Sequence, residues 1–239
     1  MFEKISNIKV EEKSTWDQKI FITMDMDWCN DEVLSFTLDI IDEYQFNVTF
    51  FVTHETKLLQ RMRKNDNIEL GIHPNFNPLL NGNFYYGENI NEVISYYKTI
   101  VPEAVSVRSH SMTQSSPILE TFVKHGLKYD CNSFVPHSSN IELKPYAHWS
   151  KELIKVPYFW EDDVHCLYNW EWNISKFLDA AGLKVFDFHP IHIFLNSEKI
   201  SRYENAKPLL NNFEELKKNI NDKNFGSKNF LIDLLGSNK

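Results

Sequence analysis

Two aspartates at the end of an apolar run have a spacing that could support chemistry. Residues 19–28 read Lys-Ile-Phe-Ile-Thr-Met-Asp-Met-Asp-Trp, which is typical of a buried strand that ends in Asp25 and Asp27. Side chains alternate between the two faces of a strand, so both carboxylates are expected on the same side. Two like charges this close repel each other unless a cation or a proton lies between them. The pair could be solvated residues that open a loop, but we favour half of a metal or acid–base site.

Other polar side chains occur at the equivalent position, just after an apolar segment that we predict to be a strand. A single histidine in such a place is more often a loop or core residue than a ligand, so the argument depends on the joint pattern. In a parallel barrel all these strand ends lie on one face, which carries the active site. The residues concerned are His73, Arg108, His110, Asp162, Asp163 and His189.

These residue types suit metal-assisted hydrolysis of an acyl bond. Asp27 and His73 would supply an oxygen and an imidazole nitrogen, which suit a borderline cation such as Zn²⁺. Asn77 lies four residues after His73, so a short turn could bring its amide oxygen to the same ion. A metal with three protein ligands has room for a water molecule, whose pKa it lowers to roughly 7. Asp25 could then act as general base, and His189 could protonate the leaving group from the opposite side.

The elements that must position these residues alternate between strand and helix along the chain. This alternation predicts a parallel sheet with helices outside, and about seven repeats favour a closed or nearly closed barrel over an open doubly wound sheet. We expect a single domain over 1–239, with a core at about 19–196 and a C-terminal helical extension at 197–239. The predicted strands are 19–28, 46–52, 68–72, 104–107, 127–129, 153–156 and 183–188, and the predicted helices are 31–44, 58–62, 90–100, 116–126, 174–181 and 209–220, followed by an apolar tail at 230–235.

The composition is that of an acidic globular protein. Hydrophobic residues make up 42% of the chain, and 33 acidic against 25 basic residues give a net charge of -8, which disfavours nucleic acid and anionic membranes as partners. No apolar stretch approaches the roughly 20 residues that span a bilayer, and residues 1–18 lack the apolar run of a signal peptide. Three scattered cysteines argue against a disulfide framework, so we expect a cytoplasmic location. Cys29 could be a thiolate ligand, but we favour an inert buried thiol.

The residues quoted above match a known family. From about residue 19 to residue 196 the chain resembles the polysaccharide deacetylases of carbohydrate esterase family 4, which have the NodB-homology fold. It is most similar to the divergent branch that occurs in bacterial surface-polysaccharide clusters. The resemblance implies an α/β fold of the distorted (β/α)7-type barrel class. It also implies a divalent metal cofactor, for which we expect Zn²⁺, with Mn²⁺, Co²⁺, Ni²⁺ and Mg²⁺ as alternatives.

The first three family motifs are kept to different degrees. Residues 23–27 keep the Thr-x-Asp start of the first motif, which implies Asp25 as catalytic base and Asp27 as metal ligand, although the second aspartate is displaced by one residue. The second motif, His-Ser/Thr-x-x-His, maps onto 73–77, where asparagine replaces the second histidine. An amide is a weaker ligand, which favours a harder cation. The third motif, Arg-x-Pro-Tyr, retains only Arg108, which would orient Asp25 and hold it ionised.

The last two motifs concern the catalytic histidine. The fourth, an aspartate and a tryptophan that tune this histidine, maps loosely onto 160–163. The fifth, an apolar strand ending in histidine, fits 185–189, with His192 as the fallback for His189.

The resemblance implies removal of an N-acetyl or O-acetyl group from a sugar unit during surface-polysaccharide biosynthesis. The substrate would be an acetylated sugar carried as a sugar nucleotide or a lipid-linked oligosaccharide. Aromatic rings can stack on the apolar faces of sugars, and the late tryptophans would suit this role. The residues expected to contact substrate are Trp28, His110, Trp160, Asp162, Asp163 and His192.

Two other functions stay open at this point. An apolar strand followed by Asp-x-Asp also begins the haloacid-dehalogenase-type phosphatases, with Asp25 as nucleophile and 162–163 as the acidic pair for magnesium, but this reading leaves the histidines without a role. A nucleotide-sugar glycosyltransferase, in which Asp-x-Asp also occurs, is a third and less favoured enzyme class. Alternatively, the departures at Asn77 and His110 could mark a decayed site that binds a glycan or a partner without turnover.

Overall fold

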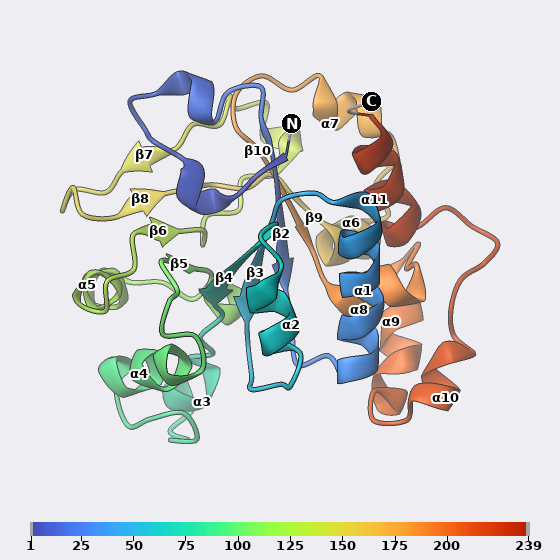
Figure 1. The fold of residues 1–239 in the computed structure, drawn as a ribbon, viewed down its shortest axis with the longest axis horizontal. Coiled ribbons are helices and arrows are strands. Elements are labelled where there is room, and N and C mark those ends of the chain that lie inside the picture. Colours follow the sequence, from blue (N-terminus) through green and yellow to red (C-terminus); the bar gives the residue numbers. More distant parts are fainter. Residues whose placement is uncertain (1, 238–239) are drawn as a thin grey trace.

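A ten-stranded sheet forms the centre of the fold over residues 2–237, which are the residues that the computed structural model describes (Figure 1). The strands are β1 (Phe2–Glu3), β2 (Ile20–Asp25), β3 (Val48–Val52), β4 (Ile68–Ile72), β5 (Ser106–Val107), β6 (Tyr129–Asp130), β7 (Tyr146–Ala147), β8 (Ile154–Lys155), β9 (Trp160–Glu161) and β10 (Lys184–Phe188). Their order is β7-β8-β6-β5-β4-β3-β2-β10-β9, and β1 pairs with β2 outside this order. Of the described pairs, β7–β8 is antiparallel and the others are parallel.

The sheet curls until its two ends approach each other. Isolated bridges join Phe134 to Tyr158 and Leu143 to Gly182, which connects the chain beside β6 and β7 with the chain beside β9 and β10. Gly182 has φ 81°, and a Cβ there would lie 2.4 Å from the Leu143 carbonyl oxygen, so this closure requires glycine. The distorted (β/α)7-type barrel of the α/β class is therefore confirmed, in preference to an open doubly wound sheet.

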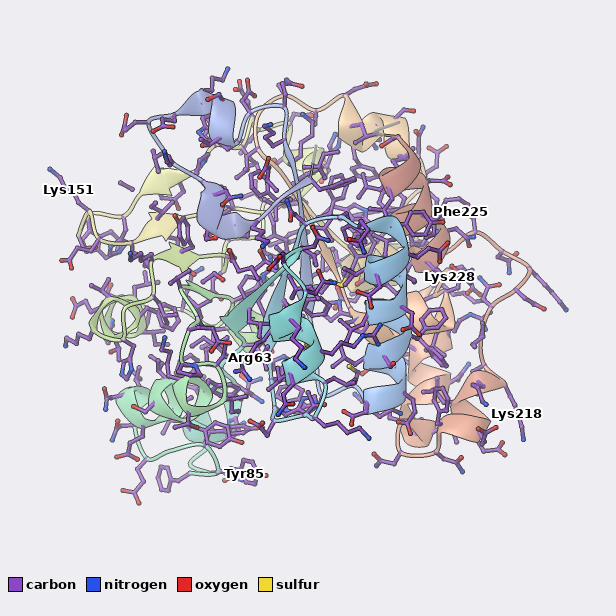
Figure 2. All side chains as sticks on the ribbon, in the orientation of Figure 1. Arg63, Tyr85, Lys151, Lys218, Phe225 and Lys228 are labelled. Carbon is purple, nitrogen blue, oxygen red and sulfur yellow. The ribbon has the colours of Figure 1, made fainter. Side chains whose placement is uncertain are left out.

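Helices cover the outside of the curled sheet (Figure 1). On one side α1 packs on α8, and α8 packs on α9 and α11, whereas α4 and α5 pack together on the other side. Charged side chains such as Lys151 and Lys218 lie at the periphery (Figure 2). None of the helices within residues 2–237 combines the length and the apolar character needed to cross a membrane. The helices are α1 (Asp31–Tyr44), α2 (Leu59–Lys64), α3 (Asn77–Leu80), α4 (Ile90–Ile100), α5 (Ser116–Lys124), α6 (Asp162–Tyr168), α7 (Ile174–Leu178), α8 (Pro190–Leu195), α9 (Ile200–Ala206), α10 (Phe213–Lys217) and α11 (Ser227–Gly236).

The continuous apolar run of β2 is explained by its central place. All six residues of the strand are buried, and β2 pairs with β3 on one side and β10 on the other. A parallel strand covered on both faces needs apolar side chains at successive positions. The register places Thr23 opposite Asp187, so two polar residues of neighbouring strands meet inside the barrel.

Several elements differ from the sequence prediction. The helix predicted at 116–126 ends at Lys124 as α5, and its N-cap is Ser115, so Pro117 occupies the second helical position. Residues 209–220 do not form one helix, because Asn212 caps a new short helix, α10, by accepting the Glu215 backbone N–H. The apolar tail at 230–235 belongs to α11, and α6 and α8 were not predicted.

Candidate active site

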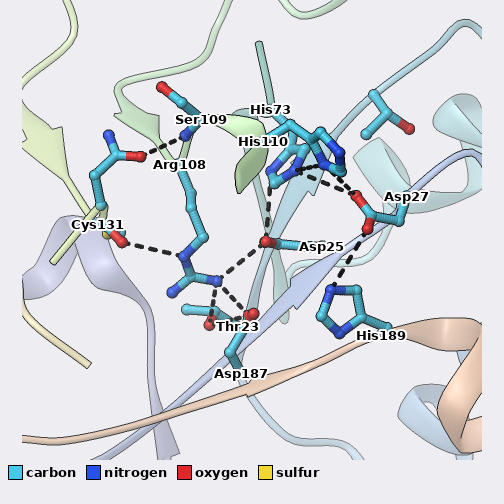
Figure 3. Close-up of polar contacts among 12 residues, drawn as sticks. Thr23, Asp25, Asp27, His73, Arg108, Ser109, His110, Cys131, Asp187 and His189 are labelled. Atoms are coloured by element: carbon cyan, nitrogen blue, oxygen red, sulfur yellow. Dashed lines mark hydrogen bonds and ion pairs between the residues drawn. The ribbon is translucent and has the colours of Figure 1, made fainter. Parts of the chain in front are cut away.

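Several strand ends meet at a pocket of about 180 Å³ (Figure 3). His73 directly follows β4, Arg108 directly follows β5, and His189 directly follows β10. These strands are parallel, so their carboxyl ends lie on one face of the barrel. The residues that line the pocket are Asp25, Asp27, His73, Arg108, Ser109, His110, Ser111, Met112, Tyr158, Glu161, Asp163, Val164 and His189.

Asp25, the last residue of β2, and Asp27, just after it, both face His73, as predicted, but strand alternation is not the reason. The strand ends at Asp25, and the next residues form a turn in which Asp27 and Trp28 have φ values of 39° and 54°. Asp25 Oδ2 lies 3.5 Å from His73 Nδ1, and Asp27 Oδ1 lies 3.2 Å from His73 Nε2. Positive φ is uncommon in non-glycine residues, and backbone of this kind occurs preferentially at functional sites.

Three potential ligand atoms converge beside this turn. Asp27 Oδ1 lies 3.2 Å from His73 Nε2 and 3.3 Å from His110 Nδ1, and the two nitrogens are 3.3 Å apart. Zinc bonds of about 2.0–2.2 Å in a tetrahedral arrangement place neighbouring ligand atoms about 3.3–3.6 Å apart. Asp27 Oδ1 is also a buried atom that makes no hydrogen bond within the described chain. The donor set therefore fits a divalent metal such as Zn²⁺.

The charge of Asp27 suits the same role. Burial alone would raise the pKa of Asp27, but contacts with His110 and His73 hold this pKa well below its usual range. His189 belongs to two other acidic groupings, one with Asp25 and Asp187 and one with Glu161 and Asp163. A protonated imidazole cannot ligate a metal, and the contacts of His189 described below favour its protonated form.

The third potential ligand is His110 and not Asn77. The side-chain amide of Asn77 donates a hydrogen bond to Ser111 Oγ over 3.2 Å, and Asn77 is not among the residues that line the pocket. Asn77 begins α3, and this short helix directs its side chain towards Ser111. The arrangement therefore favours His110, for which we expected substrate contact, over Asn77 as the third potential ligand beside Asp27 and His73.

Arg108 is buried beneath the pocket and organises two carboxyl groups. Its guanidinium lies between the rings of Phe51 and Tyr158, at 4.7 and 4.3 Å from their centroids. Nη1 donates to Asp25 Oδ1 over 3.0 Å and also to Asp187 Oδ1. The predicted contact between Arg108 and Asp25 is present, and it fixes the orientation of the carboxylate that faces the pocket.

Sequence reasoning missed Asp187, which shares this guanidinium. Burial raises the pKa of Asp187 to about 8, because the neighbouring Asp25 charge adds to the effect and Arg108 opposes it only in part. The raised pKa favours the protonated form of Asp187 at neutral pH, and Arg108 Nη1 contacts the carboxyl groups of both Asp25 and Asp187. The available signal was a single aspartate inside the apolar strand 183–188.

His189 is held by Asp162. Asp162 Oδ1 lies 2.7 Å from His189 Nδ1, and Asp162 Oδ2 accepts the backbone N–H of His189 over 3.0 Å. Nε2 faces the pocket, 3.7 Å from Asp27 Oδ2. Burial lowers the pKa of His189, but the Asp162 carboxylate outweighs this effect and raises the pKa well above its ordinary value. The Asp162 carboxylate therefore favours the protonated form of His189, whose free nitrogen Nε2 can donate a proton.

Three residues expected to contact substrate lie elsewhere. Trp160 is 0% exposed and stacks on Phe230 with ring centroids 4.6 Å apart, so the structure contradicts its expected contact with substrate. Asp162 is also fully buried and holds His189, which agrees with the fourth-motif role and not with substrate contact. His192 is buried and absent from the pocket lining, so it is not a fallback acid.

The other expected substrate residues lie in the pocket wall or next to it. Asp163 lines it, and Trp28 packs edge-on against His110 with centroids 4.9 Å apart, so substrate contact by these two residues stays a prediction. Cys29 is a free, buried thiol, and burial raises its pKa, which agrees with an inert side chain.

Comparison with known proteins identifies the family. The family model described as "WbmS-like: Polysaccharide deacetylase" matches residues 22–207. A crystal structure of WbmS from Bordetella bronchiseptica, provisionally described as a polysaccharide deacetylase involved in O-antigen biosynthesis, is 42% identical, with a TM-score of 0.93 over 100% of this chain and 98% of that chain. A Mycobacterium smegmatis structure, provisionally described as a polysaccharide deacetylase, is 15% identical, with a TM-score of 0.51 over 91% and 88% of the two chains, and shows the fold alone. No curated protein matches the chain. The chain belongs to the WbmS-like polysaccharide deacetylase family.

Proposed function

We propose that this protein is a metal-dependent deacetylase that hydrolyses an N-acetyl or O-acetyl group on a sugar unit. The observation that carries the proposal is the placement of two proton-transfer groups beside one cluster of ligand atoms. Asp25 lies on the His73 side of this cluster, and His189 lies on the side of Asp27 Oδ2. A base and an acid arranged in this way suit the hydrolysis of an acyl bond.

A divalent ion held by Asp27, His73 and His110, with Zn²⁺ as first choice, would polarise the acetyl carbonyl and acidify a water molecule. The chain supplies the proton transfers. Asp25, fixed by Arg108, accepts a proton from the attacking water. His189 donates the proton on Nε2 to the leaving nitrogen or oxygen as the bond to the acetyl carbon breaks, and acetate is released.

The substrate that we propose is an acetylated sugar of a surface polysaccharide. The described role of the 42% identical Bordetella bronchiseptica protein in O-antigen biosynthesis supports this substrate class. A sugar nucleotide or a lipid-linked oligosaccharide would present such a sugar in the cytoplasm, where we expect the protein to act. Asp163 and Trp28 are the residues that we expect to contact the sugar, because Asp163 lines the pocket, Trp28 packs against the pocket residue His110, and neither takes part in the proton transfers.

A phosphatase of the haloacid-dehalogenase type is not favoured by this arrangement. That mechanism would need Asp162 and Asp163 as an acidic pair for magnesium. Asp162 is instead fully buried and bound to the imidazole and the backbone of His189.

Metal content and acetate release test the proposal together. We expect one divalent ion per chain in the native protein, loss of that ion in His110→Ala, and its retention in the matched variant Asn77→Ala. Acetate release is measured on a panel of N-acetyl sugars, sugar nucleotides and acetylated oligosaccharides. Retention of the ion by His110→Ala and its loss in Asn77→Ala would refute the ligand assignment. A metal-loaded native protein that releases no acetate from any of these compounds would refute the deacetylase proposal and favour a glycan-binding protein without turnover.

A further inference from the structure

The C-terminal helix, outside the region matched by the family model, reaches the buried partner of His189. The family match ends at residue 207, and α11 begins at Ser227. The Ser227 hydroxyl donates a hydrogen bond to Asp162 Oδ2 over 3.3 Å, and both residues are 0% exposed. The same oxygen accepts the backbone N–H of His189, and the other carboxylate oxygen lies 2.7 Å from His189 Nδ1. Both oxygens of Asp162 are thus held.

The position of Ser227 is fixed by a close contact with the segment that follows α8. A Cβ on Gly226 would lie 2.2 Å from the Asn196 carbonyl oxygen, so the chain can approach this closely only with glycine. The Ser227 backbone N–H donates to the Ser197 carbonyl oxygen over 3.0 Å. Asn196 and Asn221 also exchange hydrogen bonds between their side-chain amides and their backbone carbonyls, at 3.0 and 2.9 Å.

A second contact of α11 supports the same carboxylate from another side. Phe230, one turn after Ser227, stacks on Trp160 with an interplanar angle of 16°. Trp160 lies two residues before Asp162, in the strand that leads to it. Phe225, just before α11, and Lys228, in its first turn, lie at the side of the molecule (Figure 2), whereas Ser227 between them is buried. The helix therefore packs against the segment that carries Asp162 and also hydrogen-bonds to the carboxylate itself.

We propose that Ser227 is a positioning residue for the acid that acts in hydrolysis. This inference rests on the proposed function, because it assigns Ser227 a role through Asp162 and His189. The hydroxyl prevents rotation of the Asp162 carboxylate, and the carboxylate in turn aims the imidazole so that Nε2 faces the pocket. Without this donor, one oxygen of Asp162 keeps only the backbone N–H of His189, and the imidazole gains orientational freedom.

The test compares Ser227→Ala with Ser237→Ala, a control at the other end of α11. The first readout is the NMR resonance of the His189 Nδ1 proton, which is sensitive to the hydrogen bond with Asp162. We expect a displaced or broadened resonance in Ser227→Ala and an unchanged one in Ser237→Ala. The second readout is steady-state kinetics of acetate release, where we expect kcat to fall about tenfold with KM unchanged, in the range seen when the outer hydrogen-bond partner of a functional side chain is removed.

Two further variants separate a positioning role from a packing role. Ser227→Cys fills the same space with a weak donor, so it should reproduce the alanine phenotype with native thermal stability. Gly226→Ala keeps the hydroxyl but moves it, so it should perturb the same resonance and also lower the melting temperature. A native Nδ1 proton resonance and native kcat in folded Ser227→Cys would overturn the inference. If the native protein releases no acetate, the proposed function fails, whereas the NMR comparison still shows whether Ser227 positions His189.

Discussion

Replacing Asp162 by asparagine removes the charge that favours the protonated form of His189, with little change in side-chain size. Asp162 makes two contacts with His189, at 2.7 Å to Nδ1 and 3.0 Å from the backbone nitrogen. Its carboxylate is the main reason why the pKa of His189 lies well above the ordinary value of 6.5, since burial acts in the opposite direction. In Asp162→Asn we therefore expect the pKa of His189 to fall to 6.5 or below.

The size of the effect follows from the fraction of His189 that carries a proton. With a pKa near 6.5, about 3% of the imidazole is protonated at about pH 8, and about three quarters at about pH 6. A general acid must hold its proton, so we expect roughly thirtyfold lower kcat/KM at about pH 8, equivalent to about 2 kcal/mol of transition-state stabilisation. At about pH 6 the protonation effect is less than twofold. Altered orientation of the ring adds a further factor that does not vary with pH.

The assay measures acetate release by the native protein, Asp162→Asn and the surface control Asp179→Asn between about pH 5.5 and pH 9. An NMR titration of the His189 ring in the metal-free protein gives its pKa without any substrate. The native-to-variant rate ratio should rise about tenfold for each pH unit above the variant pKa. A ratio that stays constant over this range would refute the view that Asp162 sets the protonation of His189. Native activity of Asp162→Asn at about pH 8 would mean that His189 is not the acid.

The other predictions concern the remaining charges and the metal. Asp25→Asn should keep the fold and the metal, but its rate of acetate release should fall at least about a hundredfold. Asp187→Asn should keep most activity below about pH 8, because the raised pKa of Asp187 favours its protonated form there. Equal losses of activity in the two variants would contradict the assignment of Asp25 as the base. Burial lowers the pKa of His165 to about 4 from 6.5, so the unfolded chain binds a proton that the native state does not. Native stability should therefore fall as pH drops from about 6.5 to about 4, by at most about 3 kcal/mol. Urea unfolding of His165→Gln should show a smaller fall in the free energy of unfolding over this pH range. Parallel pH dependences of stability in the variant and the native protein would count against this explanation. Removal of metal by a chelator should lower the melting temperature, and Zn²⁺ at about a hundred times its dissociation constant should restore about 2.7 kcal/mol of the free energy of unfolding. Scanning fluorimetry measures the melting temperature. An unchanged value would argue against a metal site formed by the folded chain.

The residues at the ends of buried strands, or directly after them, could be predicted from the sequence. Asp25, His73, Arg108 and His189 each end an apolar segment, and parallel strands bring such ends to one face, so local pattern and topology were sufficient. The proximity of Asp27 was also predicted, although a turn with positive φ produces it and strand alternation does not.

The place of His110 beside Asp27 and His73 could not be predicted, because it depends on how two strands pair. Ile72 in β4 is the register partner of Val107 in β5, and the His110 backbone N–H donates to the Pro74 carbonyl oxygen over 3.0 Å. This pairing brings His110 beside His73, whereas spacing within one segment pointed to Asn77.

The roles of Trp160, Asp162 and Ser227 depend on burial and on long-range packing. Trp160 and Asp162 lie two residues apart in a polar and aromatic stretch, and the sequence does not show that both are fully enclosed. Ser227 is 65 residues from its partner Asp162, at the start of a helix that looks in the sequence like an apolar tail. Single-residue patterns carry no information about such a contact.

The distribution of Asp27, His73 and His110 over three different strand ends has an evolutionary consequence. Ligands that share one helix tolerate no change in the number of residues between them. Here 36 residues separate His73 from His110 (positions 74–109), and the loop within this stretch, at 81–89, can gain or lose residues without moving either nitrogen. A one-residue shift of β5 against β4 would instead turn the side chains of β5 to the other face. Homologous chains should therefore vary freely in loop length here but preserve the alignment of these two short strands.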